Sequence, residues 1–168
     1  MGAVGDLAPK GQTFGPISIW DKRILEAHEH ALLTQSGAKL VDGKQVNLGN
    51  FIDDHDFVLV SPGVDVGLYA AQHHKILTEL DFFAAFFKKP VVAITGSVGK
   101  TTVTRLLGAL TNMLPVSSAK AGAFAIQGDR LRTVIGGNVG IGMLDLISSQ
   151  DVVDAAIVEL SSFQLEFN

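Results

Sequence analysis

The chain has 168 residues, of which 47% are hydrophobic and 18% charged, and its formal net charge is −4. This composition predicts a folded protein with a buried core and excludes a disordered chain, while the scattered basic residues argue against binding to nucleic acid. The absence of cysteine excludes disulfides and thiolate metal sites. No apolar run approaches the ~18 residues of a membrane span, and the N-terminal residues lack the pattern of a signal peptide.

Apolar and helical stretches alternate along the chain, which is typical of a parallel α/β sheet. In the first half, the sequence predicts strands at residues 17–20 and 57–60, with a helix at residues 24–33 between them. A second helical stretch is expected from about residue 67 to 80, continuing through the phenylalanine-rich segment 82–87. The phenylalanines have helical spacing, which indicates a core or interface face. A membrane-surface helix is the alternative, and its lack of basic residues disfavours it.

Lys88-Lys89-Pro90 is a helix stop, because lysines favour a last helical turn and proline cannot continue a helix. We therefore place a domain boundary here, with a first domain at residues 1–89 and a second at residues 90–168. The elements expected in the second domain are, in order, a strand at 91–95, a helix at 100–113, a loop at 114–130 with room for a short strand at 123–126, a strand at 131–135, a helix at 140–147 and a strand at 155–160.

One motif carries most of the functional information: TGSVGKTT, residues 95–102, between a predicted strand and a predicted helix. Glycines let several backbone N–H groups point at one anion, the helix N-terminus adds partial positive charge, and Lys100 adds a full charge. The Thr101 hydroxyl stands where a phosphate-bound Mg²⁺ needs a ligand. Only two residues separate Gly96 from Gly99, whereas the common P-loop has four, which points away from ordinary kinases and GTPases. A plain glycine turn before a helix is the alternative.

Two further motifs follow predicted strands, and the carboxyl ends of parallel strands share one edge, where ligands bind. In Gly136-Gly137-Asn138, the Asn138 amide suits a phosphate oxygen and Gly137 permits close approach, although a plain left-handed turn is a nearly equal alternative. Glu159 ends an apolar strand, where a carboxylate costs free energy unless it is paired. Mg²⁺ is one such partner for Glu159, and exposure to solvent is the alternative.

Taken in order, these motifs resemble the Mur ligases of peptidoglycan synthesis, whose phosphate loop has the same compact form. VELSSFQLE at residues 158–166, with GGNVG at 136–140 and SPGV at 61–64, resembles the branch that adds D-glutamate to UDP-N-acetylmuramoyl-L-alanine. The resemblance runs from about residue 17 to the end of the chain and covers only the first part of a family member. It implies an α/β fold, with a Rossmann-like UDP-binding parallel-sheet domain followed by a truncated P-loop-type central domain, in a cytoplasmic enzyme.

The resemblance also implies ATP and Mg²⁺ as cofactors and assigns roles to individual residues. Lys100 would be the catalytic residue that stabilises the transferred phosphoryl group, and Thr101 and Glu159 would hold the metal. The ATP phosphates would be bound by Gly96, Ser97, Val98, Gly99, Lys100, Thr101 and Thr102. The UDP-sugar would be bound by Asp21, Arg23, Ser61, Pro62, Gly63, Gly137, Asn138, Ser161 and Gln164.

The implied reaction has two steps. The carboxylate of UDP-N-acetylmuramoyl-L-alanine attacks ATP to form an acyl phosphate, and the amine of D-glutamate then attacks that intermediate and releases phosphate. The sequence departs from the family at Val98, where Asn is common, and before residue 17, where no first strand and glycine loop are recognisable. The family's histidine-containing metal motif, modified lysine and C-terminal domain also have no counterpart, so we expect the chain by itself to form no ADP.

Two other hypotheses remain open. A non-catalytic nucleotide or UDP-sugar binding module, derived from a Mur ligase, would keep part of the site without its chemistry. A small P-loop phosphotransferase would transfer phosphate to another acceptor, and the compact loop and the SSFQ string disfavour it. No protein partner is evident from the sequence.

Overall fold

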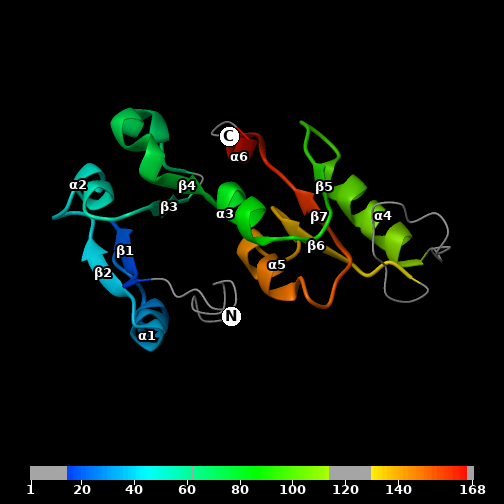
Figure 1. Cartoon of the computed structure of the whole chain (residues 1–168), viewed down its shortest axis with the longest axis horizontal. Helices are drawn as coiled ribbons and strands as arrows, with labels where there is room; N and C mark the ends of the chain where they lie inside the picture. Colours follow the sequence, from blue (N-terminus) through cyan, green and yellow to red (C-terminus); the bar gives the residue numbers. More distant parts are fainter. Residues whose placement is uncertain (1–14, 62, 114–129, 166–168) are drawn as a thin grey trace. The chain divides into compact units, whose positions relative to one another are not determined.

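The computed structural model describes residues 15–61, 63–113 and 130–165, and it shows strands alternating with helices along the chain (Figure 1). The described residues form two compact units, which divide between Leu77 and Thr78, with Ser61 and Gly63 grouped with the second unit. The division lies before the boundary expected at residues 89 and 90, so the phenylalanine-rich helix belongs to the second unit. The assignment of UDP binding to the first domain and of ATP binding to the second remains a prediction. None of the described helices is long and apolar enough to cross a membrane.

The first unit begins with a β-α-β arrangement. Strands β1 (Ser18–Asp21) and β2 (Lys39–Asp42) pair in parallel, with Asp21 opposite Asp42, and helix α1 (Ala27–Ser36) connects them. Helix α1 ends at Gly37, whose φ of 72° lies in the left-handed region that glycine adopts without strain. Strand β2 was not predicted, because its four residues include only two apolar ones and give no clear period.

The turn after β2 packs closely against the end of β1. The indole Nε1 of Trp20 donates a hydrogen bond to the Val46 carbonyl at 2.7 Å. A Cβ at Gly43 would lie 2.8 Å from a Trp20 ring atom and 3.0 Å from the Asp21 carbonyl carbon, so only glycine fits here without a shift. These contacts hold the end of β1 in place, and Asp21 and the loop that follows it begin there.

Helix α2 (Leu48–Asp53), strand β3 (Val58–Val60), the 3₁₀ helix η2 (Val66–Lys75) and strand β4 (Ile76–Thr78) complete the first unit, with β3 and β4 hydrogen-bonded to each other. The Lys75 ammonium donates to the Asp53 carbonyl at 2.8 Å, which places a positive charge at the C-terminus of α2. Helix α2 was not predicted either.

The single helix expected from about residue 67 through the phenylalanines is wrong. Ile76–Thr78 is extended, and helix α3 (Glu79–Phe86) starts anew after it. The Thr78 hydroxyl accepts a hydrogen bond from the Asp81 N–H at 3.1 Å, and the Asp81 carboxylate accepts one from the Thr78 N–H at 2.8 Å. This reciprocal cap ends the strand and begins the helix, and the Thr-x-x-Asp spacing is its sequence signal.

The second unit is a three-stranded parallel sheet, which confirms the expected parallel α/β arrangement. Strand β7 (Ala155–Glu159) lies between β5 (Val91–Ile94) and β6 (Thr133–Gly137), and all of its residues are buried (Figure 1). Helix α4 (Lys100–Met113) follows β5 and packs on β6 and β7. Its Gly108 has no room for a side chain, since a Cβ would lie 2.5 Å from Ile135 Cδ1. The expected loop at 114–130, with its possible strand, lies outside the described residues except for Arg130.

Helix α5 (Met143–Ser149) packs against α3, and their apolar side chains form the core on this side of the second unit. Phe82, Phe83 and Phe87 are buried, which confirms the expectation that the phenylalanine-rich segment forms core. At the start of β7, the buried Asp154 carboxylate accepts hydrogen bonds from the Arg132 guanidinium at 2.9 and 3.1 Å and from its backbone N–H at 2.9 Å. This pair joins β6 and β7 at the end of the strands opposite the glycine loop.

Candidate functional site

The glycine loop lies between the end of β5 and the start of α4. Gly96 has a φ of 139° and Gly99 a φ of 82°, values that residues with a side chain rarely adopt. A Cβ at either position would meet no atom within 4 Å, so backbone conformation rather than crowding requires glycine here. The loop therefore has the local geometry and the open surroundings of an anion-binding turn.

Lys100 is the first residue of α4, and its side chain reaches back across the loop. Its ammonium donates a hydrogen bond to the Gly96 carbonyl at 2.7 Å. The positive charge is therefore held at the loop itself, close to the N-terminal end of α4, where unpaired N–H groups add partial positive charge. An anion at this loop would meet all of these donors together.

The strand register brings the three predicted motifs to one edge of the sheet. Ile94 of β5 and Gly137 of β6 both lie opposite Glu159 of β7. The Asn138 N–H donates to the Glu159 carbonyl at 3.0 Å, and the Leu160 N–H donates to the Ile94 carbonyl at 2.9 Å. The expectation that the loop, the Gly-Gly-Asn turn and Glu159 share an edge is confirmed.

Glu159 is 5% exposed, and its carboxylate oxygen Oε2 has no hydrogen-bond partner within the part of the chain that the structure describes. A buried carboxylate oxygen without a partner is costly, so the position suits a cation or a donor that a ligand would supply. Among the described residues, no group of three or more His, Asp or Glu side chains could hold a metal ion. A metal next to Glu159 would therefore take most of its ligands from phosphate and water.

The SSFQ string forms a helix cap. The Gln164 side-chain oxygen accepts hydrogen bonds from the Ser161 N–H at 2.8 Å and the Ser161 hydroxyl at 3.0 Å, and the Ser161 hydroxyl accepts one from the Gln164 N–H at 3.2 Å. This is a Ser-x-x-Gln capping box at the start of helix α6 (Ser162–Leu165). Ser161 and Gln164, both expected to contact the UDP-sugar, are thus bonded to each other. Helix α6 was not predicted, although the Ser-x-x-Gln spacing of a capping box is present in the sequence.

The glycines of the Gly-Gly-Asn turn are required by packing within the sheet. Gly137 has a φ of 94°, and a Cβ there would collide with the Glu159 carbonyl oxygen. A Cβ at Gly136 would lie 2.6 Å from a Leu146 side-chain atom. The close approach that the sequence indicated at Gly137 is therefore an approach to β7. The Asn138 side chain is exposed at the same edge.

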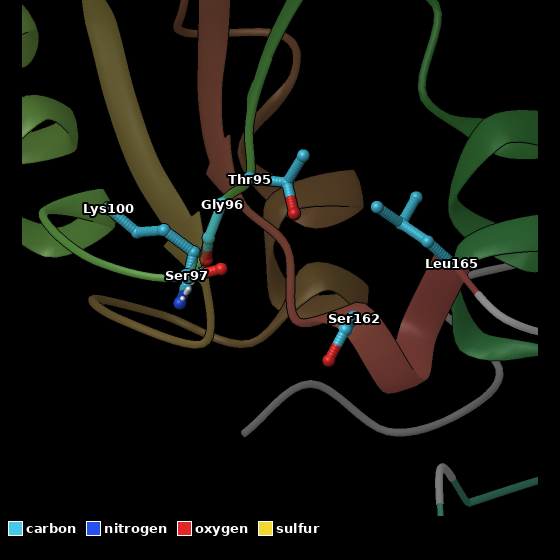
Figure 2. A pocket seen from close by; sticks show the side chains of 6 residues that line it. All are labelled: Thr95, Gly96, Ser97, Lys100, Ser162 and Leu165. Atoms are coloured by element: carbon cyan, nitrogen blue, oxygen red, sulfur yellow. Dashed lines mark hydrogen bonds between the residues drawn. The ribbon is translucent and has the colours of Figure 1, made fainter.

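A pocket of about 480 Å³ opens beside the glycine loop (Figure 2). The loop contributes one side and α6 the other, as Figure 2 shows, and the lining residues are Thr95, Gly96, Ser97, Lys100, Ser162 and Leu165. Thr95, Ser162 and Leu165 were not among the site residues expected from the sequence. Ser162 lies within the SSFQ string, between the two predicted site residues Ser161 and Gln164.

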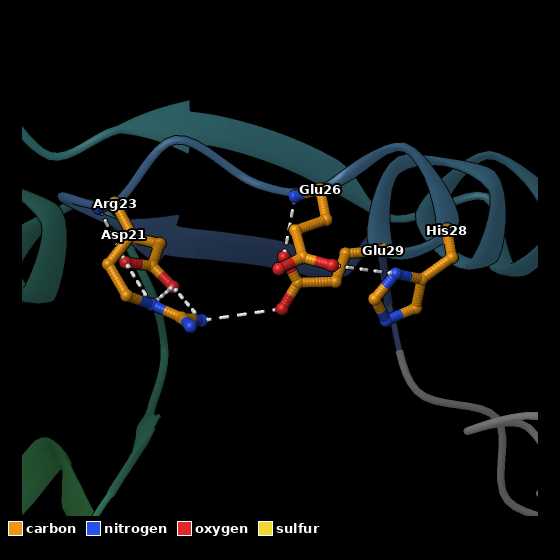
Figure 3. A network of polar contacts seen from close by, with 5 residues as sticks. All are labelled: Asp21, Arg23, Glu26, His28 and Glu29. Carbon is orange, nitrogen blue, oxygen red and sulfur yellow. Dashed lines mark hydrogen bonds and ion pairs between the residues drawn. The ribbon is translucent and has the colours of Figure 1, made fainter.

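In the first unit, the loop after β1 forms a polar network (Figure 3). The Asp21 carboxylate accepts hydrogen bonds from the Arg23 backbone N–H and from its guanidinium Nη2, both at 2.8 Å. Arg23 also lies 3.6 Å from Oε1 of Glu29, and the other carboxylate oxygen of Glu29, Oε2, accepts a hydrogen bond from the Glu26 N–H at 2.7 Å. Two residues expected to bind the UDP-sugar therefore pair with each other.

Of the Ser-Pro-Gly turn, Ser61 and Gly63 are exposed, and Pro62 lies outside the described residues.

Replacing Arg23 by alanine should raise the pKa of Asp21. Hydrogen bonds from Arg23 hold the pKa of the Asp21 carboxyl below its ordinary value of 3.8. Because the charged carboxylate is favoured in the folded state, its contribution to stability is present above pH 3.8 and lost as the pH falls through the lowered pKa. An NMR titration of the Asp21 side-chain carbon measures the shift. Lys22→Ala is the matched control, and an unchanged Asp21 titration in Arg23→Ala would contradict the pairing.

No protein family model matches this chain. Several curated proteins, however, are similar to it in sequence. The chain is 37% identical over 151 residues to the UDP-N-acetylmuramoylalanine–D-glutamate ligase of Desulfotalea psychrophila, an alignment that covers 87% of this chain and 30% of the ligase. The ligase of the same description from Geotalea uraniireducens is 40% identical over 116 residues, covering 66% of this chain and 22% of the ligase. This chain is a homologue of the Mur ligases.

The match to the Mur ligases confirms the family resemblance but extends over only part of their length. A third relative of the same description, from Pseudomonas syringae, is 38% identical over 70% of this chain and 23% of the ligase. The chain thus spans less than a third of the curated ligases that it matches. Among solved structures, a pseudomurein peptide ligase type C from Methanothermus fervidus aligns with 87% of this chain and 28% of its own, at 19% identity and a TM-score of 0.34.

Proposed function

We propose that this chain is the nucleotide- and UDP-sugar-binding part of an ATP-dependent ligase that joins D-glutamate to UDP-N-acetylmuramoyl-L-alanine. The observation that carries the proposal is the glycine loop with Lys100, set at one sheet edge with the buried Glu159, whose Oε2 has no hydrogen-bond partner among the described residues. The three Mur ligases described above carry this activity in their names, which is the source of the proposed substrates.

In this proposal the second unit is a P-loop-type domain. The N–H groups of residues 96–102 surround the ATP phosphates, and Lys100 exchanges its bond to the Gly96 carbonyl for one to a phosphate oxygen. The side chain of Val98 is 94% exposed, so its lack of a polar group leaves the backbone donors in place. The first unit is the Rossmann-like UDP-binding domain, and its residues Asp21 and Arg23 contact the uridine.

The residues at the sheet edge also fit a magnesium ion. Glu159 and the Thr101 hydroxyl would be its protein ligands, and the unpartnered Oε2 of Glu159 supports this assignment. When bound, Mg²⁺ supplies positive charge that offsets the charge on the ATP phosphates. The other ligands would be phosphate oxygens and water, because the described residues offer no larger cluster of carboxylates and histidines.

The proposed reaction activates a carboxylate. An oxygen of the alanyl carboxylate attacks the γ-phosphorus of ATP, the bond between that phosphorus and the bridging oxygen breaks, and ADP leaves with the electron pair. The amine of D-glutamate then attacks the acyl carbon, phosphate leaves, and the amine proton passes to a base. Lys100 stabilises the negative charge that develops on the transferred group. Asn138 and the Ser161–Gln164 pair hold the sugar end of the substrate.

A non-catalytic binding module is the second candidate. Its support is that the glycine loop and Lys100, which can bind phosphate without any chemistry, both lie within this segment. The two candidates differ in ADP formation by the protein in which this segment occurs. A ligase forms ADP only when ATP, UDP-N-acetylmuramoyl-L-alanine and D-glutamate are all present, whereas a binding module binds one of them and forms none.

Titration calorimetry with ATP tests the nucleotide and metal site directly. We expect binding that strengthens with Mg²⁺ and that loses most of this dependence in Glu159→Gln, because the substitution removes the charge that the metal would neutralise. Asp151→Asn, an exposed carboxylate in the same unit, is the matched control. If the ATP affinity of the wild type and of Glu159→Gln depends equally on Mg²⁺, Glu159 does not bind the metal. If the chain does not bind ATP at all, the loop is not a nucleotide site.

A further inference from the structure

Ser162 contributes an unused hydroxyl to the far side of the loop pocket. It is exposed, and within the described ranges its hydroxyl makes no hydrogen bond. It lines the same pocket as Thr95, Ser97 and Lys100 but projects from α6 instead of from the loop (Figure 2). Hydroxyl groups and an ammonium thus surround one opening, and all of them can donate hydrogen bonds to an anion.

The backbone around Ser162 is held in place from both sides. Just before it, the Leu160 N–H donates to the Ile94 carbonyl at 2.9 Å, which ties this segment to the last residue of the strand that enters the glycine loop. Just after it, Gln164 is 8% exposed and bonded to Ser161 in the capping box. Ser162, the pocket-lining residue between the members of the capping box, therefore has a defined position, and its hydroxyl is free of other described residues.

We propose that Ser162 binds the terminal phosphate of the nucleotide held by the glycine loop, and so distinguishes ATP from ADP. This rests on the proposed nucleotide site. The loop N–H groups and Lys100 surround the phosphates that lie within the loop. Only a phosphate that extends beyond the loop toward α6 reaches Ser162, which comes from the opposite side of the pocket. A nucleotide with one phosphate fewer would leave this hydroxyl unused.

The apolar neighbour of Ser162 strengthens the same interaction. Leu165 lines the pocket from α6, and Figure 2 shows its side chain extending toward the loop. A leucine at the rim leaves less room for water in the pocket. A hydrogen bond to a charged oxygen is stronger where less water competes for it. Ser162 is therefore a binding residue for the phosphoryl group that the proposed reaction transfers.

The test compares ATP with ADP in the presence of Mg²⁺, by titration calorimetry on the wild-type chain and on Ser162→Ala. A hydrogen bond to a charged group contributes enough that its loss should weaken ATP binding roughly tenfold, with ADP affinity unchanged. Ser162→Thr keeps a hydroxyl and should restore most of the ATP affinity. Ser148→Ala, an exposed serine on α5, is the matched control and should bind both nucleotides as the wild type does.

The outcomes separate this inference from the proposed nucleotide site. Equal ATP affinity in the wild type and Ser162→Ala, or an equal loss for ATP and ADP, would overturn the role of Ser162. If the wild type binds ATP in a Lys100-dependent way in those cases, the nucleotide site itself stands. If the wild type binds neither nucleotide, both proposals fail. Matching melting temperatures for the wild type and the serine variants exclude an effect of folding.

Discussion

Replacing Lys100 by alanine should weaken ATP binding by roughly a hundredfold, because it removes the one full positive charge at the loop together with its charge-assisted hydrogen bonds. In the structure the ammonium already lies at the loop, 2.7 Å from the Gly96 carbonyl, so its contact with phosphate requires only an exchange of partners. Titration calorimetry with ATP and Mg²⁺ measures the change in affinity. Lys100→Arg keeps the charge on a larger group and should bind ATP with an intermediate affinity.

The control for Lys100→Ala is Lys89→Ala, which removes the same charge before β5, at the opposite end of the strand from the loop. It should leave ATP affinity unchanged, because charges separated by about a Debye length interact weakly through solvent at physiological salt. Equal ATP affinities in the wild type and Lys100→Ala would contradict the loop's proposed role. Unfolding curves for both lysine variants show whether the loop variant keeps its fold.

Replacing Gly137 by alanine should destabilise the second unit by about 3 kcal/mol or more, because two independent costs add. The φ of 94° is strained for any residue with a Cβ, and the new methyl group would collide with the Glu159 carbonyl oxygen, which the backbone cannot easily move. That carbonyl also accepts the hydrogen bond from Asn138, so relief of the collision would disturb the sheet edge. Urea unfolding measures the loss as a lower midpoint.

Gly142→Ala is the matched control for Gly137→Ala. Gly142 precedes α5 in the same unit, has a φ of −60° that alanine adopts freely, and its Cβ would meet its nearest atom, on Asp145, at 3.4 Å. We expect its stability to stay within about 0.5 kcal/mol of the wild type. If Gly137→Ala unfolds at the same urea concentration as Gly142→Ala, the packing role of Gly137 is wrong.

The second unit could be predicted largely from the sequence, because its signals are local. A continuous apolar run before the glycine loop predicted β5, and the helical pattern after it predicted α4 over the range that the structure shows. The glycine spacing and Lys100 also pointed to an anion before any tertiary contact was known. In the first unit, β2 and α2 were missed, because short elements with few apolar residues gain their stability from contacts with distant segments.

The partners of the site residues could be recognised only in the tertiary structure. The sequence by itself determined that a glycine loop, a Gly-Gly-Asn turn and Glu159 each end a strand, since strand ends and turn residues are set by neighbours in the chain. The tertiary structure decided that Gly137 packs against Glu159 and that Ser162 faces Lys100 across a pocket. Those pairs are formed by strand register and chain crossover, and residues far apart in sequence carry no local signal of which of them will meet.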